Sequence, residues 1–275
     1  PSSAASDVYK RQVGVLEKKD LNEKNLIGLM TGRAETGEKS KSVAVQTKTD
    51  KVVMRAENLV VWPESKPVNF EVKRGEIVGV TGLDGNGQDD FVKILAGVQE
   101  AHGGTTEILD TNENFTKYSS LENAKKNGIS FVSGDRKKEG ILPNLSIYEN
   151  LVVPLYKKTS RAGFLGFIDW LELNGIFEWE VDRLSIKTGP RDNLIGSLSG
   201  GNQQKVMIAR SFAQHPKVLI LNDPARGIDV STKRDLYVHL RNYVEEGNTV
   251  VFLSSELEEF IGLCPKVMVF RNGTV

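Results

Sequence analysis

The chain has 275 residues, of which 26% are charged and 39% are hydrophobic, as in ordinary globular α/β proteins. Lysine and arginine total 36, and so do aspartate and glutamate, so the formal net charge is zero. This balance excludes the basic excess that a nucleic-acid binder normally carries. The single cysteine, Cys264, excludes an internal disulfide and fits a reducing compartment. No apolar run approaches the roughly 18 residues of a membrane-spanning helix, so we expect a soluble cytoplasmic protein that can still dock on a membrane partner.

Composition divides the chain into four segments. Residues 1–12 have no apolar core after their charges, unlike a signal peptide, and we interpret them as a non-native or unassigned leader. Residues 13–33 carry a short helical pattern that Gly32 would end. Residues 34–51 are polar and are predicted to form a linker. A larger domain is expected from Val52 to the C-terminus.

Strand and helix patterns alternate within this domain. Residues 52–58 and 68–72 alternate apolar and polar side chains, whereas 77–81 is an unbroken apolar run suited to a central parallel strand. Further strands are expected at 129–132, 218–221, 249–254 and 267–270, and helices at 89–95, within 148–185, at 202–214 and after a Ser231 N-cap. This alternation predicts an α/β fold with a mostly parallel sheet and a helical insertion. The Asn272-Gly273 hairpin signal close to the last residue predicts a fragment that stops within a hairpin.

A glycine-rich turn, Gly82-Leu83-Asp84-Gly85-Asn86-Gly87-Gln88-Asp89-Asp90, lies between a predicted buried strand and a predicted helix. The spacing from Gly82 to Gly87 fits a phosphate-binding P-loop and not the glycine pattern of a dinucleotide-binding fold. Two positions depart from the P-loop pattern. Gln88 replaces the lysine that reaches the β- and γ-phosphates, and Asp89 replaces the hydroxyl that holds magnesium.

These replacements reverse the electrostatics of the turn, because a cation is lost and Asp89 and Asp90 bring carboxylates to the place of a phosphate. Two unit charges about 4 Å apart interact by roughly 4 kcal/mol at an effective dielectric of about 20, enough to abolish tight nucleotide binding. Without nucleotide, the carboxylates could satisfy free N–H groups at the helix N-terminus. Weak ATP binding and a capped turn without ligand are both consistent with these residues.

Three further motifs follow in order. Leu198-Ser199-Gly200-Gly201-Asn202-Gln203-Gln204-Lys205 opens a helix with a hydroxyl and two glycines, an arrangement that exposes N–H groups to an anion. Residues 218–224 form a buried strand that ends in Asn222-Asp223-Pro224, at the edge where ligand groups collect in open α/β sheets. Arg226-Gly227-Ile228-Asp229 is a tight turn before the next helix.

Together these motifs resemble the nucleotide-binding domain of ABC transporters. The extension Asn202–Lys205 and the turn Arg226–Asp229 are similar to those of monosaccharide (ribose/galactose-type) importers, whose ATPase subunit carries two such domains in one chain. Gly134-Asp135-Arg136-Lys137-Lys138-Glu139-Gly140 resembles the segment that replaces the glutamine loop in the second domain of that family. Ser254-Ser255-Glu256-Leu257 resembles its switch region, where serine stands for histidine. The likeness begins near Val13, and residues 13–33 resemble the tail of a first domain.

The resemblance implies a P-loop NTPase-like ABC ATPase fold, with an antiparallel β subdomain and a helical subdomain at about 145–210. It implies an ATP-binding subunit that couples ATP and Mg²⁺ binding and ATP hydrolysis to solute uptake at the cytoplasmic face of the membrane. The implied partners are the preceding nucleotide-binding domain of the same polypeptide and transmembrane permease subunits, with no nucleic acid. The implied residues at this domain's own nucleotide site are Trp62, Gly82, Asp84, Gly85, Asn86, Gly87, Gln88, Asp89 and Asp90.

Nucleotide domains of this family pair head to tail, so each site joins one P-loop to the signature of the other domain. The signature residues, which would act on ATP held by the first domain, are Leu198, Ser199, Gly200, Gly201, Asn202 and Gln203. The domain's own site looks degenerate by the same resemblance. The magnesium-ordering aspartate aligns with Asn222, a poorer ligand. The catalytic glutamate aligns with the shorter Asp223, and a displacement of about 1 Å can cost about a hundredfold in rate. Ser255, at the switch histidine, does not titrate near neutral pH.

We therefore expect this half to bind nucleotide weakly or not at all and to hydrolyse essentially none. Trp62 is placed like the aromatic that stacks on adenine in the family, but an edge-strand aromatic is equally consistent. Tyr148–Pro154 and Phe164–Phe167 resemble the helical subdomain that contacts membrane subunits, although aromatics at helical spacing also build cores. A non-catalytic regulatory or structural module and a nucleoside-type importer are the alternative functions, while the neutral charge argues against an ABC ATPase acting on nucleic acid.

Overall fold

The computed structural model describes residues 49–156 and 168–275. All of them belong to the second of the two units into which the chain divides, Val43–Val275. The expected leader, the helix within 13–33, nearly all of the linker and Phe164–Phe167 therefore lie outside the described residues.

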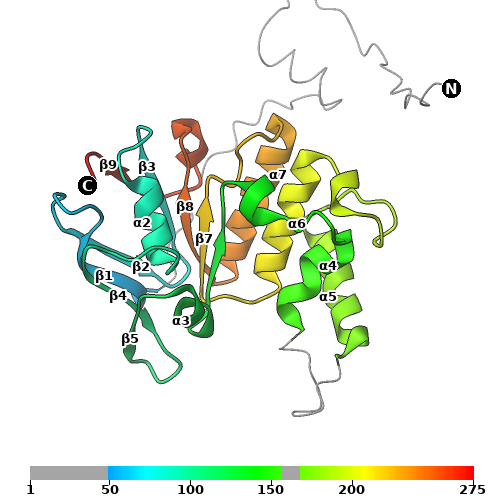
Figure 1. The fold of residues 1–275 in the computed structure, drawn as a ribbon, viewed down its shortest axis with the longest axis horizontal. Helices are drawn as coiled ribbons and strands as arrows, with labels where there is room; N and C mark the ends of the chain where they lie inside the picture. Colours follow the sequence, from blue (N-terminus) through cyan, green and yellow to red (C-terminus); the bar gives the residue numbers. More distant parts are fainter. Residues whose placement is uncertain (1–48, 157–167) are drawn as a thin grey trace, which may run out of the picture. The chain divides into compact units, whose positions relative to one another are not determined.

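A five-stranded parallel sheet with the order β6-β7-β8-β3-β9 forms the centre of the domain (Figure 1). Its strands are β3 (Ile77–Gly82), β6 (Ile129–Val132), β7 (Val218–Asn222), β8 (Thr249–Leu253) and β9 (Lys266–Phe270). Every residue of β7 and β8 is buried, because other elements cover both faces of the sheet. The five strands predicted from the sequence are confirmed, each within one residue at its ends.

Alternating side chains along these strands belong to two hydrophobic cores. One core joins the sheet to α2 (Gln88–Leu95) and to the antiparallel sheet; its members from the central strands include Val78, Val80, Ile220 and Val251. The other core joins the sheet to α6 (Gly200–Phe212) and α7 (Val230–Glu245); its members from the central strands include Ile77, Leu219, Leu221, Val250 and Phe252.

The antiparallel sheet has the strand order β2-β1-β4-β5. It consists of β1 (Val52–Val60), β2 (Val68–Lys73), β4 (Gly103–Leu109) and β5 (Phe115–Tyr118). β1 and β2 were predicted from the sequence, whereas β4, β5 and the short helix α3 (Leu121–Lys126) were not. β4 begins with two glycines, which usually indicate a turn, and it becomes a strand because it pairs along nearly the whole of β1.

The helical subdomain lies beside α6, away from the antiparallel sheet (Figure 1). It contains α4 (Ile147–Val152), the 3₁₀ turn η3 (Val153–Leu155), α5 (Trp170–Arg183) and the 3₁₀ turn η5 (Ile195–Ser197). The buried residues of α5 are Leu173, Phe177 and Glu180, which lie on one side of the helix. A capping box starts α4: the Ser146 hydroxyl accepts the Glu149 N–H, and the Glu149 carboxylate accepts the Ser146 N–H.

The start of α7 differs from the sequence expectation. Its N-cap is Asp229 and not Ser231, because the Asp229 carboxylate accepts the N–H of Thr232 at 3.0 Å and so begins the helix two residues earlier. The helix ends at its C-cap Glu246, and Gly247 follows directly with a left-handed φ of 95°. The remaining short elements are the π-turn η2 (Arg136–Gly140) and the 3₁₀ turn η6 (Leu257–Phe260). Across the described ranges, no helix is both long and apolar enough to span a membrane.

Candidate nucleotide site

The P-loop, the end of β7 and the switch region meet at the carboxyl edge of the parallel sheet, where ligands bind in open α/β folds. They line a cavity of about 550 Å³. Of the residues predicted from the sequence, the cavity contains Asp84, Gly85, Gln88, Asp89, Asn222, Asp223 and Ser255. The other predicted residues are not part of its lining: the signature residues, Trp62, Gly82, Asn86, Gly87 and Asp90.

Gln88 closes the phosphate loop on itself. Its amide nitrogen donates to the carbonyl oxygens of Gly82 at 3.2 Å and Leu83 at 3.0 Å, so the side chain lies inside the loop. The Gln88 Oε1 is buried and has no hydrogen-bond partner among the described residues. These two bonds orient the amide and leave an acceptor, where the P-loop pattern requires a lysine ammonium. An acceptor offers nothing to a phosphate oxygen.

Asp89 is held by two partners from different elements. Its Oδ1 accepts a hydrogen bond from the Asn222 amide at 2.6 Å, and its Oδ2 forms an ion pair of 2.5 Å with Lys93, one turn later in α2. This ion pair raises the pKa of Lys93, chiefly through the hydrogen bond that Lys93 donates to Asp89. The P-loop pattern has a hydroxyl at position 89, and the resemblance places an aspartate at position 222. In this chain the carboxylate, Asp89, therefore lies on α2, and the neutral amide, Asn222, lies at the end of β7.

Asp90 binds Trp62 instead of a backbone group. The indole N–H of Trp62 donates to Asp90 Oδ2 at 2.8 Å. The N-cap of α2 is Gly87, and no side chain caps this helix, so the expectation that Asp89 and Asp90 satisfy its free N–H groups is wrong. The reason is competition: both carboxylates find side-chain donors, Asn222 and Trp62, on other strands and loops.

The hairpin turn at the C-terminal end of the chain packs on the P-loop. Arg271 and Thr274 exchange backbone hydrogen bonds, as the Asn-Gly signal predicts. The N–H of Gly273 donates to the Asn86 carbonyl at 2.9 Å, and the N–H of Asn272 donates to Asn86 Oδ1 at 3.0 Å. A Cβ at Gly87 would lie 2.9 Å from the Gly273 Cα and 3.4 Å from Trp62 Cζ2. The Trp62 ring, the P-loop and this turn are thus packed together.

The cavity has an acidic lining. Five carboxylates (Asp84, Asp89, Asp135, Glu139 and Asp223) face two cations (Lys93 and Arg226). Burial raises the pKa of Asp223, and the nearby carboxylates of Glu259 and Glu256 raise it further, against the opposing effect of Arg226 and Lys233. A nucleoside triphosphate would add several negative charges to a site that already disfavours the ionised form of its own Asp223. Gln88 and Asp89 supply neither the lysine nor the hydroxyl that the P-loop pattern uses to hold phosphate and magnesium.

Asp223 and the switch serines, Ser254 and Ser255, also lie at the carboxyl edge of the parallel sheet. Asp223 has a left-handed φ of 45°, and its N–H donates to the Leu253 carbonyl at 2.9 Å. Ser254 and Ser255 both line the cavity; Ser255 is exposed, whereas Ser254 is buried and its hydroxyl donates to Glu259 at 2.6 Å. The structure therefore places a structural hydrogen bond at Ser254, next to the position that the resemblance assigns to the switch.

The signature residues lie at the N-terminus of α6, outside the cavity. Ser199 is the N-cap, is exposed, and its hydroxyl accepts bonds from the Asn202 N–H at 3.4 Å and the Asn202 side-chain amide at 3.1 Å. The Gln203 amide donates to the Leu198 carbonyl at 3.1 Å, which fixes the turn before the helix. Side chains thus order this turn and leave the Ser199 end of the helix open to solvent.

Two contributors were not anticipated from the sequence. Lys93, the ion-pair partner of Asp89, could have been found, because it follows Asp89 by four residues on a predicted helix. The contact of the Asn272-Gly273 turn with Asn86 had no sequence signal, because the two segments are 186 positions apart.

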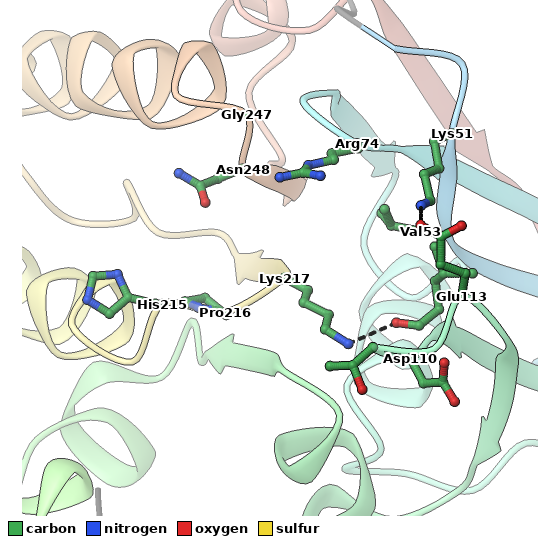
Figure 2. A pocket seen from close by; sticks show the side chains of 12 residues that line it. Lys51, Val53, Arg74, Asp110, Glu113, His215, Pro216, Lys217, Gly247 and Asn248 are labelled. Carbon is green, nitrogen blue, oxygen red and sulfur yellow. Dashed lines mark hydrogen bonds and ion pairs between the residues drawn. The ribbon is translucent and has the colours of Figure 1, made fainter. Parts of the chain in front are cut away.

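A second cavity, of about 330 Å³, lies at the opposite edge of the sheet (Figure 2). Arg74, Lys217 and Asn248 line it just before β3, β7 and β8 respectively. Lys217 donates to the Leu109 carbonyl at 3.0 Å, and Lys51 pairs with Glu113. None of the residues predicted for the nucleotide site lines this cavity, and it lies at the amino ends of the strands, so we exclude it as the nucleotide site.

The fold is that of ATP-binding cassettes. The domain superposes on a dimeric ATP-binding cassette in a post-hydrolysis state bound to ADP and Pi with a TM-score of 0.68, at 23% identity, over 81% of this chain and 96% of that chain. It superposes equally on a nucleotide-free ATP-binding cassette from an ABC transporter, with a TM-score of 0.68 at 18% identity, over 81% of this chain and 89% of that one.

Sequence comparison extends this from fold to family. Residues 65–226 match the family model described as ABC transporter. The chain is 33% identical over 265 residues to a putative ribose/galactose/methyl galactoside import ATP-binding protein of Halalkalibacterium halodurans, covering 96% of the chain and 49% of the relative. It is 38% identical to a ribose import ATP-binding protein of Bacillus cereus, over 76% of the chain and 41% of the relative. It is 35% identical to an arabinose import ATP-binding protein of Burkholderia ambifaria, over 93% of the chain and 48% of the relative.

The chain belongs to the ABC transporter family, as an ATP-binding domain. It spans about half the length of the curated relatives that it matches.

Proposed function

We propose that this domain is the second, signature-supplying half of the ATPase subunit of a sugar-type ABC importer. The relatives at 33–38% identity are named as ribose, galactose and arabinose import proteins, and the chain matches about half of each. The observation that carries the proposal is the contrast between two sites on one domain. The P-loop is bonded to its own surroundings, whereas the signature end of α6 is ordered and exposed.

The internal bonds of the P-loop support loss of nucleotide binding. Gln88, Asp89 and Asp90 each have partners inside the domain, so ATP would have to break these bonds and enter a cavity lined by five carboxylates and two cations. Asn222 and Asp223 stand where the family has a magnesium-ordering aspartate and a catalytic glutamate. In the proposed function, this domain's own P-loop therefore does not hydrolyse ATP.

The signature end of α6 supports a role in trans. Helix α6 runs from Gly200 to Phe212, so the positive end of its macrodipole lies at Ser199–Gly201. Ser199 keeps its hydroxyl at the surface. In the head-to-tail arrangement of the family, this end faces ATP held by a preceding nucleotide-binding domain, to which we assign residues 13–33 as the tail and 34–51 as the linker.

Helix α5 supports a permease partner. Trp170, Leu171 and Trp179 expose 53%, 82% and 67% of their surface on this helix, whereas Tyr148 is buried and packs 5.1 Å from Phe177 between ring centroids. Large apolar side chains that stay exposed often mark protein–protein contacts. In the proposed function, exposed side chains of α5 contact the membrane subunits, and the buried Tyr148 belongs to the core of the helical subdomain.

The first test is a titration of the 275-residue chain with fluorescently labelled ATP in the presence of Mg²⁺. We expect no saturable binding up to millimolar nucleotide, because the Gln88 and Asp89 side chains are bonded within the domain and the cavity is acidic. Micromolar affinity accompanied by turnover contradicts the proposal. A P-loop-intact ABC domain measured in the same assay serves as the positive control.

The second test is Ser199→Arg in the complete ATPase subunit with its permease. The long cation would fill the exposed end of α6, and we expect ATPase activity to fall to background. Ser197→Arg is the matched control, since Ser197 is also exposed but lies before the signature helix; it should retain activity. Unchanged activity of Ser199→Arg would favour a non-catalytic structural module.

A further inference from the structure

The π-turn η2, which follows β6, is tied to the signature helix at both of its ends. Arg136 Nη1 donates to the carbonyl oxygen of Gly200 at 2.9 Å, at the first turn of α6. Arg210 Nη2, near the other end of α6, donates to the carbonyl oxygen of Gly140 at 2.5 Å. The two bonds run in opposite directions between the elements, so each element supplies one guanidinium and one carbonyl. Both are charge-assisted hydrogen bonds, the stronger kind.

Close packing accompanies these bonds. A Cβ at Gly200 would lie 3.0 Å from Arg136 Nη2, and a Cβ at Gly140 would lie 2.3 Å from the Met207 side chain of α6. A side chain at either position would therefore displace the Arg136 guanidinium or the end of the Met207 side chain. This contact gives the second glycine-containing segment, Gly134–Gly140, a physical role that the proposed function does not use.

The position of Arg136 is otherwise unfavourable. A cation at a helix N-terminus opposes the macrodipole. Its Nε is buried and has no acceptor among the residues that the structure describes. At the other end, burial lowers the pKa of Arg210, so that guanidinium has also lost hydration. Both guanidiniums are partly desolvated, and their hydrogen bonds join η2 to α6.

We propose that Arg136 is a positioning residue for the signature motif. It fixes the Gly200 peptide, and together with Arg210 it makes η2 and α6 one rigid unit. Displacement of the segment after β6 then moves the Ser199–Gly201 turn with it. That Arg136 thereby positions the signature toward ATP held by another domain rests on the proposed function. The hydrogen bond between Arg136 and the signature turn does not depend on it.

The test compares Arg136→Gln and Arg136→Lys with Lys137→Gln, a matched loss of charge at an exposed neighbour in the same turn. Hydrogen–deuterium exchange of residues 198–205 is measured on the 275-residue chain without nucleotide. We expect Arg136→Gln to speed exchange there by roughly tenfold, the scale of one lost charge-assisted bond, with Arg136→Lys intermediate and Lys137→Gln unchanged. Exchange in β7 serves as the internal reference, since a general loss of stability would speed it too.

In the complete subunit with its permease, Arg136→Gln should raise the KM for ATP by roughly tenfold while Lys137→Gln keeps the parent value. Parent-like exchange and an unchanged KM in Arg136→Gln overturn the inference, and the proposed function survives if Ser199→Arg still abolishes activity. Faster exchange in Arg136→Gln together with full activity of Ser199→Arg supports the positioning role and overturns the proposed function instead.

Discussion

Asn222→Asp is expected to destabilise the domain by about 2–4 kcal/mol at pH 8. The change removes the 2.6 Å hydrogen bond from the Asn222 amide to Asp89 and puts a second carboxylate in its place, at a residue that is only 6% exposed. Like charges about 4 Å apart repel by roughly 4 kcal/mol at an effective dielectric of about 20. The expected value is lower because the Asp89 side chain is 49% exposed and paired with Lys93. Urea unfolding followed by circular dichroism measures the difference.

A double-mutant cycle with Asp89→Ser separates this repulsion from other effects of the substitution. Asp89→Ser alone should cost about 1–2 kcal/mol, since the Asn222 amide loses its acceptor. The double variant should be more stable than Asn222→Asp alone, because only one carboxylate remains at the site.

Asn123→Asp, in the exposed first turn of α3, is the matched control and should be nearly neutral. Equal stability of Asn222→Asp and the parent at pH 8 would contradict this prediction. It would show that the domain does not need an amide at position 222 to accommodate the carboxylate at position 89.

Glu180→Gln is expected to stabilise the domain at alkaline pH. Glu180 on α5 is 1% exposed, and burial raises its pKa from 4.5 to about 7, with Glu246 adding to the shift and Arg183 opposing it. Because the folded pKa is raised, the favourable contribution of the protonated carboxyl is complete below pH 4.5 and is lost as the pH rises to about 7. The loss amounts to about 3 kcal/mol by the value of one pKa unit.

The free energy of unfolding of Glu180→Gln should therefore exceed that of the parent by up to about 3 kcal/mol at pH 8.5 and approach it at pH 5. Arg183 keeps its 2.7 Å ion pair with Glu246 in this variant. Glu178→Gln, an exposed glutamate on the same helix, controls for the loss of one negative charge. If the stability difference between Glu180→Gln and the parent does not change with pH, Glu180 is not the titrating group.

The parallel sheet and its motifs were predictable because their signals are local. A continuous apolar run at residues 77–81, followed by Gly82 to Gly87, indicates a buried strand and a phosphate loop without knowledge of any other segment. β4 and β5 were not predictable in the same way, since their formation depends on pairing with β1 and with each other. The N-cap of α7 was misplaced because Asp229 and Ser231 are both good N-caps, and the preceding turn decides between them.

The sequence by itself determined that the lysine and hydroxyl of the P-loop are replaced by Gln88 and Asp89, and that the signature Leu198–Gln203 retains its residues. It could not determine where the replaced side chains go. Asp89 meets Asn222 from a strand 133 positions away, Asp90 meets Trp62, and the loop backbone meets Gly273. The local sequence determines which polar groups need hydrogen-bond partners, but only the folded chain brings those partners within hydrogen-bond distance. The tertiary structure alone therefore decided that these side chains bond within the domain.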